Sequence, residues 1–568
     1  MRACRTEIAR LAAVALLLSV PARAQSTAPV PLLPDNATPA PAAGDDNAAP
    51  APDQDIQSTP LTPADPSWIG TLGPADSALP RTMWTGTPRG VVSAALPLLQ
   101  PTTSPALQDL ARRLLLSDAI APPGADQPGA PGLPELRLDR LLALGRIDAT
   151  PLIDALPDAV RSETFDRDSV ELKIAAADVA GACRLVQDRV GHYRNAWWDR
   201  ALIACQALNG VFDQAALGLS AMREQKTARD PVFEALIDTI DGHRQKLDKL
   251  PDPTPLRMAL LAAAHLPLPP DALAAATPAA LAVWATSDKV PALQRLAAAE
   301  RAEQLGSLPP AALGLVYASI DVKPGEQDAA VAGGKLPDDA RGRALLYDFA
   351  RSNAAPDARV GALAPLLADA RRRGALVAFA RLVAPLVVEL KPEPAYQAFA
   401  GDAARVLLAS GHIDEASDWV ALAHTPELLM IDELARSGDG AREAPLLQNA
   451  MAALAARDPA AAPRQADLLL ALGAALGVPR GDVPLAPLLQ LPHPGMLPGA
   501  ALWLDQILST AAGRFGETVL TSVLMATAGD KLSPEPVVLA RVVAGLKAIG
   551  LEADARAIAV EAALDAGI

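Results

Sequence analysis

The sequence predicts an all-α protein made of irregular, tetratricopeptide-like helical-hairpin repeats, arranged as an α-solenoid or elongated helical array after a disordered Pro/Ala-rich N-terminus. Ala/Leu-rich runs with helical spacing recur along the chain, and no segment alternates apolar and polar residues as a half-buried strand does. Hydrophobic residues make up 51% of the chain but aromatic residues only 3%. Small apolar side chains of this kind favour helices that pack closely.

The clearest helical hairpin lies in residues 403–424, AARVLLASGHIDEASDWVALAH. An apolar run through Leu407 stops at Gly411, which suits the left-handed position that closes a helix. A second run, through Trp419, begins at Asp414, an acidic residue suited to a helix N-terminus, where backbone N–H groups lack partners. The stretch therefore predicts a helix, a tight turn and a second helix.

The same turn signal recurs in three other places, with Gly145 before Asp148, Gly210 before Asp213, and Gly550 before Glu552. Helical hairpins cannot bury an apolar face alone, so repeated copies stack on their neighbours. The copies are irregularly spaced, and the aromatic positions of the tetratricopeptide pattern are mostly missing. An irregular helical bundle with a common Gly-x-x-Asp link is therefore the alternative to a repeat array.

The N-terminus has the pattern of a secretory signal peptide. Arg2, Arg5 and Arg10 precede the apolar run LAAVALLLSV, and small residues follow up to Ala24. We expect residues 1–24 to be removed by cleavage after Ala24, because the run is too short for a stable membrane span. Pro or charged residues interrupt the later apolar runs, which predicts no stable membrane insertion. The expected location is the periplasm, or the exterior after secretion.

Cys183 and Cys205 are the cysteines that follow the signal peptide. An even number of cysteines in an oxidising compartment favours a disulfide bond. Two antiparallel helices would bring residues at this separation together, and the bond would stabilise the fold by about 3 kcal/mol. The alternative is a redox pair, although the usual Cys-x-x-Cys spacing is missing.

Composition and Pro/Gly-rich breaks divide the chain into six expected regions. These are a signal peptide (1–24), a disordered Ala/Pro-rich tether (25–66), an irregular Trp-containing strap (67–104), an N-terminal helical region (105–250), a middle helical region (251–330) and a C-terminal helical repeat region (331–568).

Three tryptophans are the candidate interaction residues. Trp68 and Trp84 lie among prolines and glycines, so they either fasten the strap to the helical body or form an exposed aromatic patch. Trp198 follows Trp197, and adjacent helical residues cannot both face the core squarely. One indole is expected near the cysteines, and the other against a neighbouring helix or a partner.

The sequence offers little for other classes of function. A net charge of −15 argues against sequence-independent nucleic-acid binding and against adhesion to anionic lipid. The motifs His-Glu-x-x-His and Gly-x-Ser-x-Gly are missing, and no cysteine or carboxylate pattern joins His412 and His424 in a metal site. We therefore name no catalytic, cofactor-binding or metal-binding residue and expect no enzymatic activity.

Several blocks together resemble a family of exported alphaproteobacterial all-helical proteins. They are TMWTGTPRGVV, Trp197-Trp198 through Cys205, LQRLAAAERAEQLGSLPPAALGLVYAS, GRALLYDFA and ARVLLASGHIDEASDW. Its members often carry the label antifreeze glycopeptide polyprotein, and the resemblance implies export and a helical fold. It brings no activity or site residue, and the chain has no regular Thr-bearing period of the kind that ice binding needs.

Taken together, these features predict an exported helical-repeat scaffold or protein-interaction protein that holds another envelope protein. Solenoids present extended surfaces for such contacts. The alternatives are a structural or stress-related envelope protein with no dedicated partner, and an enzyme that grips cell-wall glycan. The sequence identifies neither the partner nor the oligomeric state.

Overall fold

The computed structural model describes residues 65–568, except 226–228, 333–338, 437–445, 482, 484, 486, 487 and 489–496. Residues 64–568 form one compact unit. The expected signal peptide, with its cleavage site, and residues 25–64 of the expected tether lie outside the described residues.

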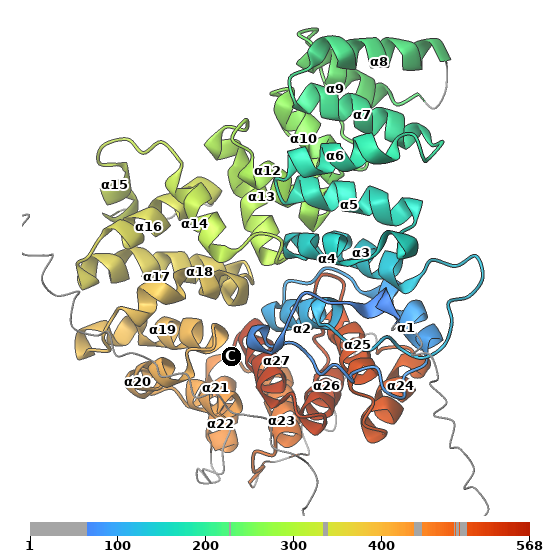
Figure 1. Ribbon diagram of the computed structural model, residues 1–568. Helices are drawn as coiled ribbons and strands as arrows, with labels where there is room; N and C mark the ends of the chain where they lie inside the picture. The colour runs from blue at the N-terminus through green and yellow to red at the C-terminus, as the bar shows by residue number, and fades with distance from the viewer. Residues whose placement is uncertain are drawn as a thin grey trace, which may run out of the picture. The chain divides into compact units, whose positions relative to one another are not determined.

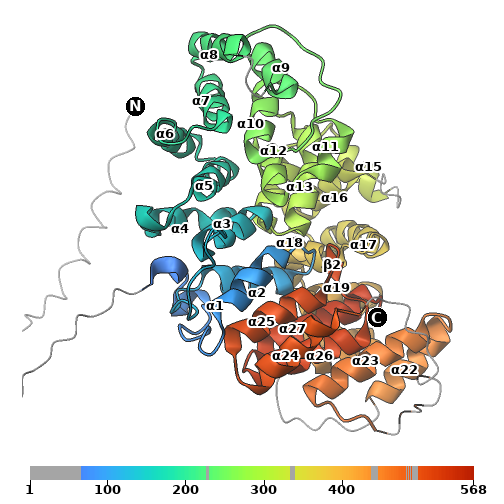
Figure 2. The ribbon, with the colours of Figure 1, turned by 90° about the vertical axis from the view of Figure 1, so that its right-hand side faces the viewer.

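The described part of the chain is all-α, with 27 α-helices, many of which pack against the next helix in the chain (Figures 1 and 2). The N-terminal elements are η1 (Pro66–Trp68), η2 (Pro74–Asp76), α1 (Arg89–Ala95), η3 (Leu96–Leu98), α2 (Pro105–Leu116), α3 (Leu133–Ala143), η4 (Ile147–Ala149), α4 (Thr150–Ala155), η5 (Asp158–Val160), α5 (Glu163–Ala175), α6 (Val179–Arg189), α7 (Ala196–Leu208), α8 (Phe212–Gln225) and α9 (Pro231–Ile240). The middle helices are α10 (Pro255–Ala263), α11 (Pro270–Ala275), α12 (Pro278–Thr286), α13 (Ala292–Gln304), α14 (Pro310–Ala318) and α15 (Glu326–Ala332).

The C-terminal elements are α16 (Ala340–Ser352), α17 (Pro356–Arg372), α18 (Leu376–Val388), η6 (Pro394–Tyr396), α19 (Gln397–Ala409), α20 (Ile413–Ala423), α21 (Pro426–Ala435), α22 (Leu446–Arg457), α23 (Ala462–Leu476), α24 (Ala500–Ala511), α25 (Phe515–Ala526), β1 (Thr527–Ala528), β2 (Lys531–Leu532), α26 (Pro536–Ala548) and α27 (Glu552–Asp565). The two short strands pair antiparallel as a small hairpin. None of the described helices has both the length and the apolar character required to cross a membrane.

The four predicted helix-closing glycines all adopt positive φ, from 69° at Gly145 to 88° at Gly550. At the turn between α19 and α20, His412 N–H donates to the Leu407 carbonyl at 2.9 Å, which satisfies a carbonyl left free by the end of α19. Equivalent bonds close α3, α7 and α26. The predicted hairpins at Gly210, Gly411 and Gly550 are confirmed, because the helices on the two sides of each turn pack together. After Gly145 the chain continues instead as η4 and the short helix α4. Glycine suits these turns because a residue with a Cβ is strained at positive φ.

The C-terminal helix α27 lies among other helices. It contacts α2, α18, α19, α21, α23 and α26. Most sides of α27 are buried, and the buried residues are mainly alanines and β-branched residues. Their small side chains allow the neighbouring helices to approach closely. The two ends of the helical unit therefore meet through α2 and α27, as both ribbon views show.

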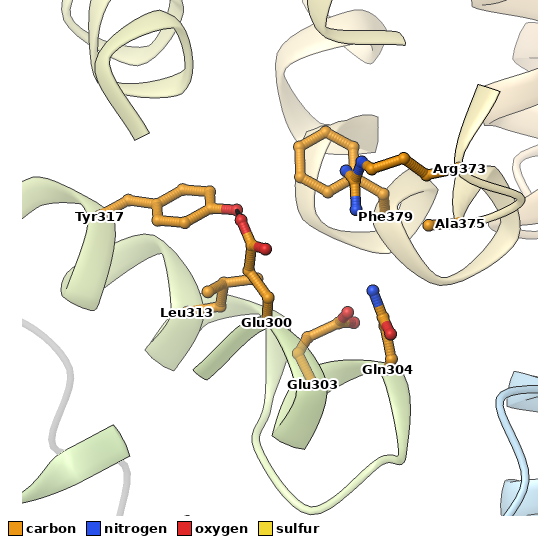
Figure 3. A pocket seen from close by; sticks show the side chains of 8 residues that line it. All are labelled: Glu300, Glu303, Gln304, Leu313, Tyr317, Arg373, Ala375 and Phe379. Atoms are coloured by element: carbon orange, nitrogen blue, oxygen red, sulfur yellow. Dashed lines mark hydrogen bonds between the residues drawn. The ribbon is translucent and has the colours of Figure 1, made fainter. Parts of the chain in front are cut away.

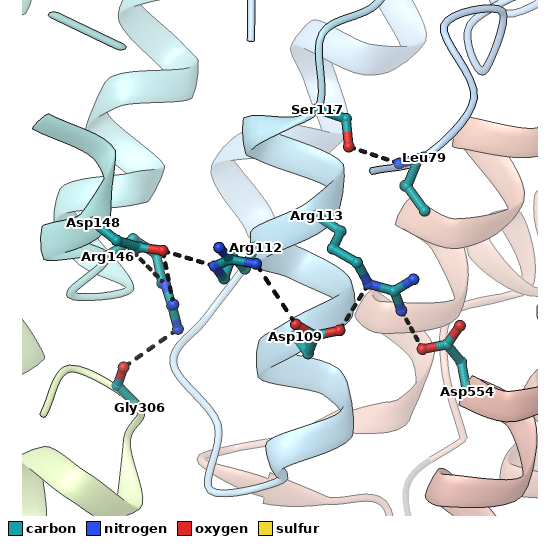
Figure 4. Close-up of polar contacts among 9 residues, drawn as sticks. All are labelled: Leu79, Asp109, Arg112, Arg113, Ser117, Arg146, Asp148, Gly306 and Asp554. Carbon is teal, nitrogen blue, oxygen red and sulfur yellow. Dashed lines mark hydrogen bonds and ion pairs between the residues drawn. The ribbon is translucent and has the colours of Figure 1, made fainter. Parts of the chain in front are cut away.

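Ion pairs reinforce this meeting of α2 and α27. Figure 4 shows Arg113 of α2 between Asp109 of the same helix and Asp554 of α27. On the other side of α2, Arg112 pairs with Asp148 at 2.7 Å. The arginines therefore join α2 to segments far away in the sequence.

The segment expected to be an irregular strap includes α1 and packs on α25. Trp68 and Trp84 are 0% and 1% exposed, and their rings meet edge to face, with the centroids 4.7 Å apart. Gly516 of α25 makes room for the Trp84 ring, which a Cβ at that position would approach to 2.8 Å. The guanidinium of Arg137 lies over the Trp68 ring at 4.7 Å. The structure therefore agrees with a strap fastened to the body and is contrary to an exposed aromatic patch.

Cys183 of α6 and Cys205 of α7 form a disulfide bond, with their Cα atoms 5.5 Å apart. Trp198 is buried, stacks on Tyr193 and donates its indole N–H to Glu163 at 3.2 Å. Trp198 is thus a core residue and offers no exposed surface to a partner. The indole of Trp197 is the half-buried one of the pair.

Candidate functional site

A cavity of about 260 Å³ lies where α3, α5, α7, α10 and α12 converge; we call it the acidic cavity. It is lined by Asp139, Leu142, Ala143, Arg167, Asp168, Glu171, Trp197, Thr254, Pro255 and Thr277. Three carboxyl groups and one guanidinium belong to the lining, and Arg140, which lies outside the lining, pairs with Asp139 at 2.6 Å. The packing of five helices, rather than a short sequence motif, brings these residues together.

Helix capping fixes part of the acidic cavity. Glu171 of α5 accepts the N–H of Leu256 at 2.8 Å, at the start of α10. Thr254 caps the same helix, and Thr277 caps α12 by accepting the Ala280 N–H at 3.3 Å. Helix N-termini favour negative charge, which explains why a buried carboxylate is held there.

Burial raises the pKa of two carboxyl groups of the cavity, those of Asp168 and Glu171. Burial raises the pKa of Asp168 to about 7, and the nearby Asp139 and Glu171 raise it as well, whereas Arg167 opposes the shift. Burial also raises the pKa of Glu171 to about 7, although its hydrogen bonds favour the charged form. Both groups therefore exchange protons near neutral pH.

Trp197 and Arg167 form one wall of the acidic cavity. The guanidinium lies 5.0 Å from the centroid of the indole, within the range of a cation–π contact. Trp197 also meets Trp198 edge to face, which ties it to a buried core residue. The covered indole face is therefore a fixed wall and is not open to a stacking ligand.

A second hollow, the α27 groove, has a volume of about 370 Å³. It lies between the turn from α19 to α20, the end of α21 and the first half of α27, and it is lined by Leu408, Ala409, Gly411, Ile413, Ala435, Glu552, Ala553, Arg556, Ala557 and Val560. Most of these side chains are small or apolar. Arg556 is held by Glu552 at 2.7 Å and by the Leu434 carbonyl at 3.1 Å, which leaves an apolar floor beside a fixed ion pair.

A third polar cluster is closely packed and leaves a space of only about 10 Å³. Figure 3 shows Tyr317 directed at Glu300, to which it donates at 2.7 Å. Arg343 binds the same carboxylate through two nitrogens, and Arg381 pairs with Glu303 at 3.0 Å. A space of this size holds no more than about one water molecule, so the cluster joins helices and admits no ligand.

The candidate residues named from the sequence and the hollows in the structure do not coincide. Trp68, Trp84 and Trp198 lie in the core. The acidic cavity is lined by Trp197 instead, because adjacent residues on a helix point in different directions and Trp197 is the one on the cavity side of α7. The adjacent tryptophans were the one usable signal in the sequence. Asp168 and Glu171 look like ordinary acidic residues of a helix, and only the packing of α3 and α10 against α5 places them in a cavity.

Among the described residues, no three His, Cys, Asp or Glu side chains converge as metal ligands would. A scan of protein-family models, a search of curated proteins and a search of solved structures each found no match to the chain.

Proposed function

We propose that the chain is an exported helical-repeat protein of the periplasm that holds a partner protein of the cell envelope and has no catalytic activity of its own. The pattern at residues 1–24 and the resemblance to exported helical proteins support the location. A disulfide bond between α6 and α7 is in keeping with an oxidising compartment.

The α27 groove is the observation that carries the proposal. Its volume of about 370 Å³ falls within the range of binding pockets in proteins, roughly 300–1,000 Å³. Ala553 and Ala557 are exposed, lie one helical turn apart and form an open side of the groove. A partner could place a large apolar or aromatic side chain there, as the central anchors of protein interfaces do.

Charge limits the kind of partner. With a net charge of −15, the chain repels acidic surfaces and attracts basic ones over the distance of a Debye length. We therefore infer an envelope protein that presents an apolar anchor from a basic surface. Nucleic acid and anionic lipid surfaces fit this charge poorly.

Filling the groove tests the proposal. In the variant Ala557→Trp the new indole occupies the space between α27 and the α19–α20 turn, so proteins that enter the groove should no longer co-purify with a tagged chain. Ala274→Trp, which makes the same change at another exposed alanine, on α11, is the matched control. The proposal predicts a partner that is retained by the control and lost from Ala557→Trp. The same set of proteins from both variants would contradict it.

A further inference from the structure

We propose that the acidic cavity binds an organic ammonium group carried on a short apolar stem. This inference does not depend on the α27 groove or on the proposed envelope partner. It rests on the charge, size and unsatisfied polar atoms of the cavity formed by α3, α5, α7, α10 and α12.

The first argument is the charge of the lining. Three carboxyl groups and a single cation, Arg167, line the cavity. Asp139 is already paired with Arg140 at 2.6 Å, so the negative charge that remains to be compensated lies on Asp168 and Glu171. A phosphate or carboxylate ligand would be repelled. A neutral ligand would leave the shielded Oδ2 atom of Asp168 without a positive partner, which is costly when that carboxylate is charged. A positively charged ligand removes this cost.

The second argument is an unsatisfied acceptor. The Oδ2 atom of Asp168 is shielded from solvent and has no hydrogen-bond partner in the described part of the chain. Glu171 differs, because its carboxylate already accepts the Leu256 N–H. An ammonium group has three donors and no acceptor, so it can satisfy Asp168 and a second carboxylate together.

The third argument is shape. A cavity of about 260 Å³ lies just below the size of drug-binding pockets, which suits a small molecule or a single side chain. Leu142, Ala143 and Pro255 supply apolar surface for a methylene stem, and Trp197 adds an aromatic wall. A free diamine and a lysine side chain of another protein both carry the required group.

Proton linkage gives the proposal a distinctive signature. Asp168 faces Asp139, Glu135, Glu171 and Arg167. The groups around Glu171 are the Leu256 N–H, Thr254, Arg167 and Arg257. Each carboxyl has a pKa of about 7, so a fraction of each is protonated near neutral pH. A bound ammonium favours the charged carboxylates, and binding should therefore release protons.

Isothermal titration of the purified chain tests this at about pH 7, in two buffers with different ionisation enthalpies. The probes are cadaverine, Nα-acetyl-lysine methylamide and the uncharged 1-pentanol. We expect at least one amine to bind with release of protons, and pentanol not to bind. Binding of cadaverine alone would identify a free amine as the natural ligand type, whereas binding of the lysine amide would identify a side chain of another protein.

Two variants locate the binding. Asp168→Asn keeps the shape but removes the unsatisfied charge, so amine affinity should fall about tenfold or more. Asp188→Asn, at an exposed position on α6, makes the same change of charge away from the lining and should bind like the parent. Unchanged urea midpoints would show that both variants fold. Failure of both amines to bind, equal binding by Asp168→Asn, or equal binding of pentanol would overturn the proposal.

Discussion

Glu561 of α27 accepts the backbone N–H of Ala106, the second residue of α2, at 2.8 Å. The same carboxylate also accepts the hydroxyl of Ser104, the residue that precedes this helix. The C-terminal helix α27 thereby caps the N-terminus of α2 across a sequence separation of 455 residues. This bond fastens the beginning of the helical unit to its end.

Removing this carboxylate should destabilise the chain. In Glu561→Ala the Ala106 N–H stays buried without its partner, which costs about 1–3 kcal/mol. The urea midpoint should fall accordingly. Glu415→Ala on α20 removes an exposed glutamate and should change stability by less than about 0.5 kcal/mol. Equal midpoints for the two variants would show that the cap is unimportant.

The same residue should make stability depend on pH. Burial raises the pKa of Glu561 to about 7, whereas a glutamate in the unfolded chain titrates near 4.3. Between these values the folded state binds more protons, so this group makes stability fall as pH rises, by at most about 1.4 kcal/mol per pH unit. Its contribution is constant below and above that window.

Glu561→Gln imitates the protonated acid and should flatten this dependence. We expect the parent to lose stability between about pH 5 and pH 8, and the glutamine variant to lose less. Asp168, Glu171 and Glu303 also have pKa values of about 7, so part of the slope should remain. Urea denaturation midpoints measured at several pH values across this range give the pH dependence of stability. A parent and variant with the same slope would contradict the assignment to Glu561.

Two glycine variants separate backbone strain from steric overlap. Gly411 has φ of 80° and open space around its Cβ position, so Gly411→Ala should cost about 1–2 kcal/mol from the left-handed backbone alone. At Gly145 a Cβ would also lie 2.5 Å from the Ser307 Cβ and 2.7 Å from the Pro278 Cβ. Gly145→Ala should therefore be the more destabilising variant in urea denaturation. A larger loss of stability in Gly411→Ala than in Gly145→Ala would contradict the close contacts of Gly145 with Ser307 and Pro278.

Loss of the disulfide bond should act locally as well as globally. Cys183→Ser with Cys205→Ser removes a crosslink across 22 residues and should lower stability by about 3 kcal/mol. Hydrogen exchange should increase most in α6 and α7. Reduction of the parent should reproduce the effect, whereas a reductant should leave the double variant unchanged. Thiol trapping that finds both cysteines free in the untreated protein would refute the bond.

The turns were predictable because they are local. Gly411 and its three counterparts meet a requirement for positive φ that the sequence displays directly, as an apolar run ending in Gly before an acidic residue. The disulfide bond was predictable for a similar reason, since one helical hairpin brings both cysteines together.

The nonlocal contacts were not predictable in this way. Nothing near Glu561 in the sequence indicates that it caps α2, and the acidic cavity draws Asp139, Asp168, Trp197 and Thr254 from four separate helices or their caps. Trp198, named as a candidate interaction residue, is buried instead. Which of the two tryptophans faces the core depends on their contacts with Glu163 and Arg167 of α5 and on the packing of α10 against α7, and the local sequence shows neither.

Site-specific photocrosslinking in living cells tests the proposed function most directly. A photoreactive residue at Ala553 or Ala557 lies in the α27 groove, and one at Ala274 reports an exposed helix elsewhere. We predict that both groove positions capture the same envelope protein and that the control position does not. Capture of no protein from the groove, or of the same protein from all three positions, would contradict a partner held at α27.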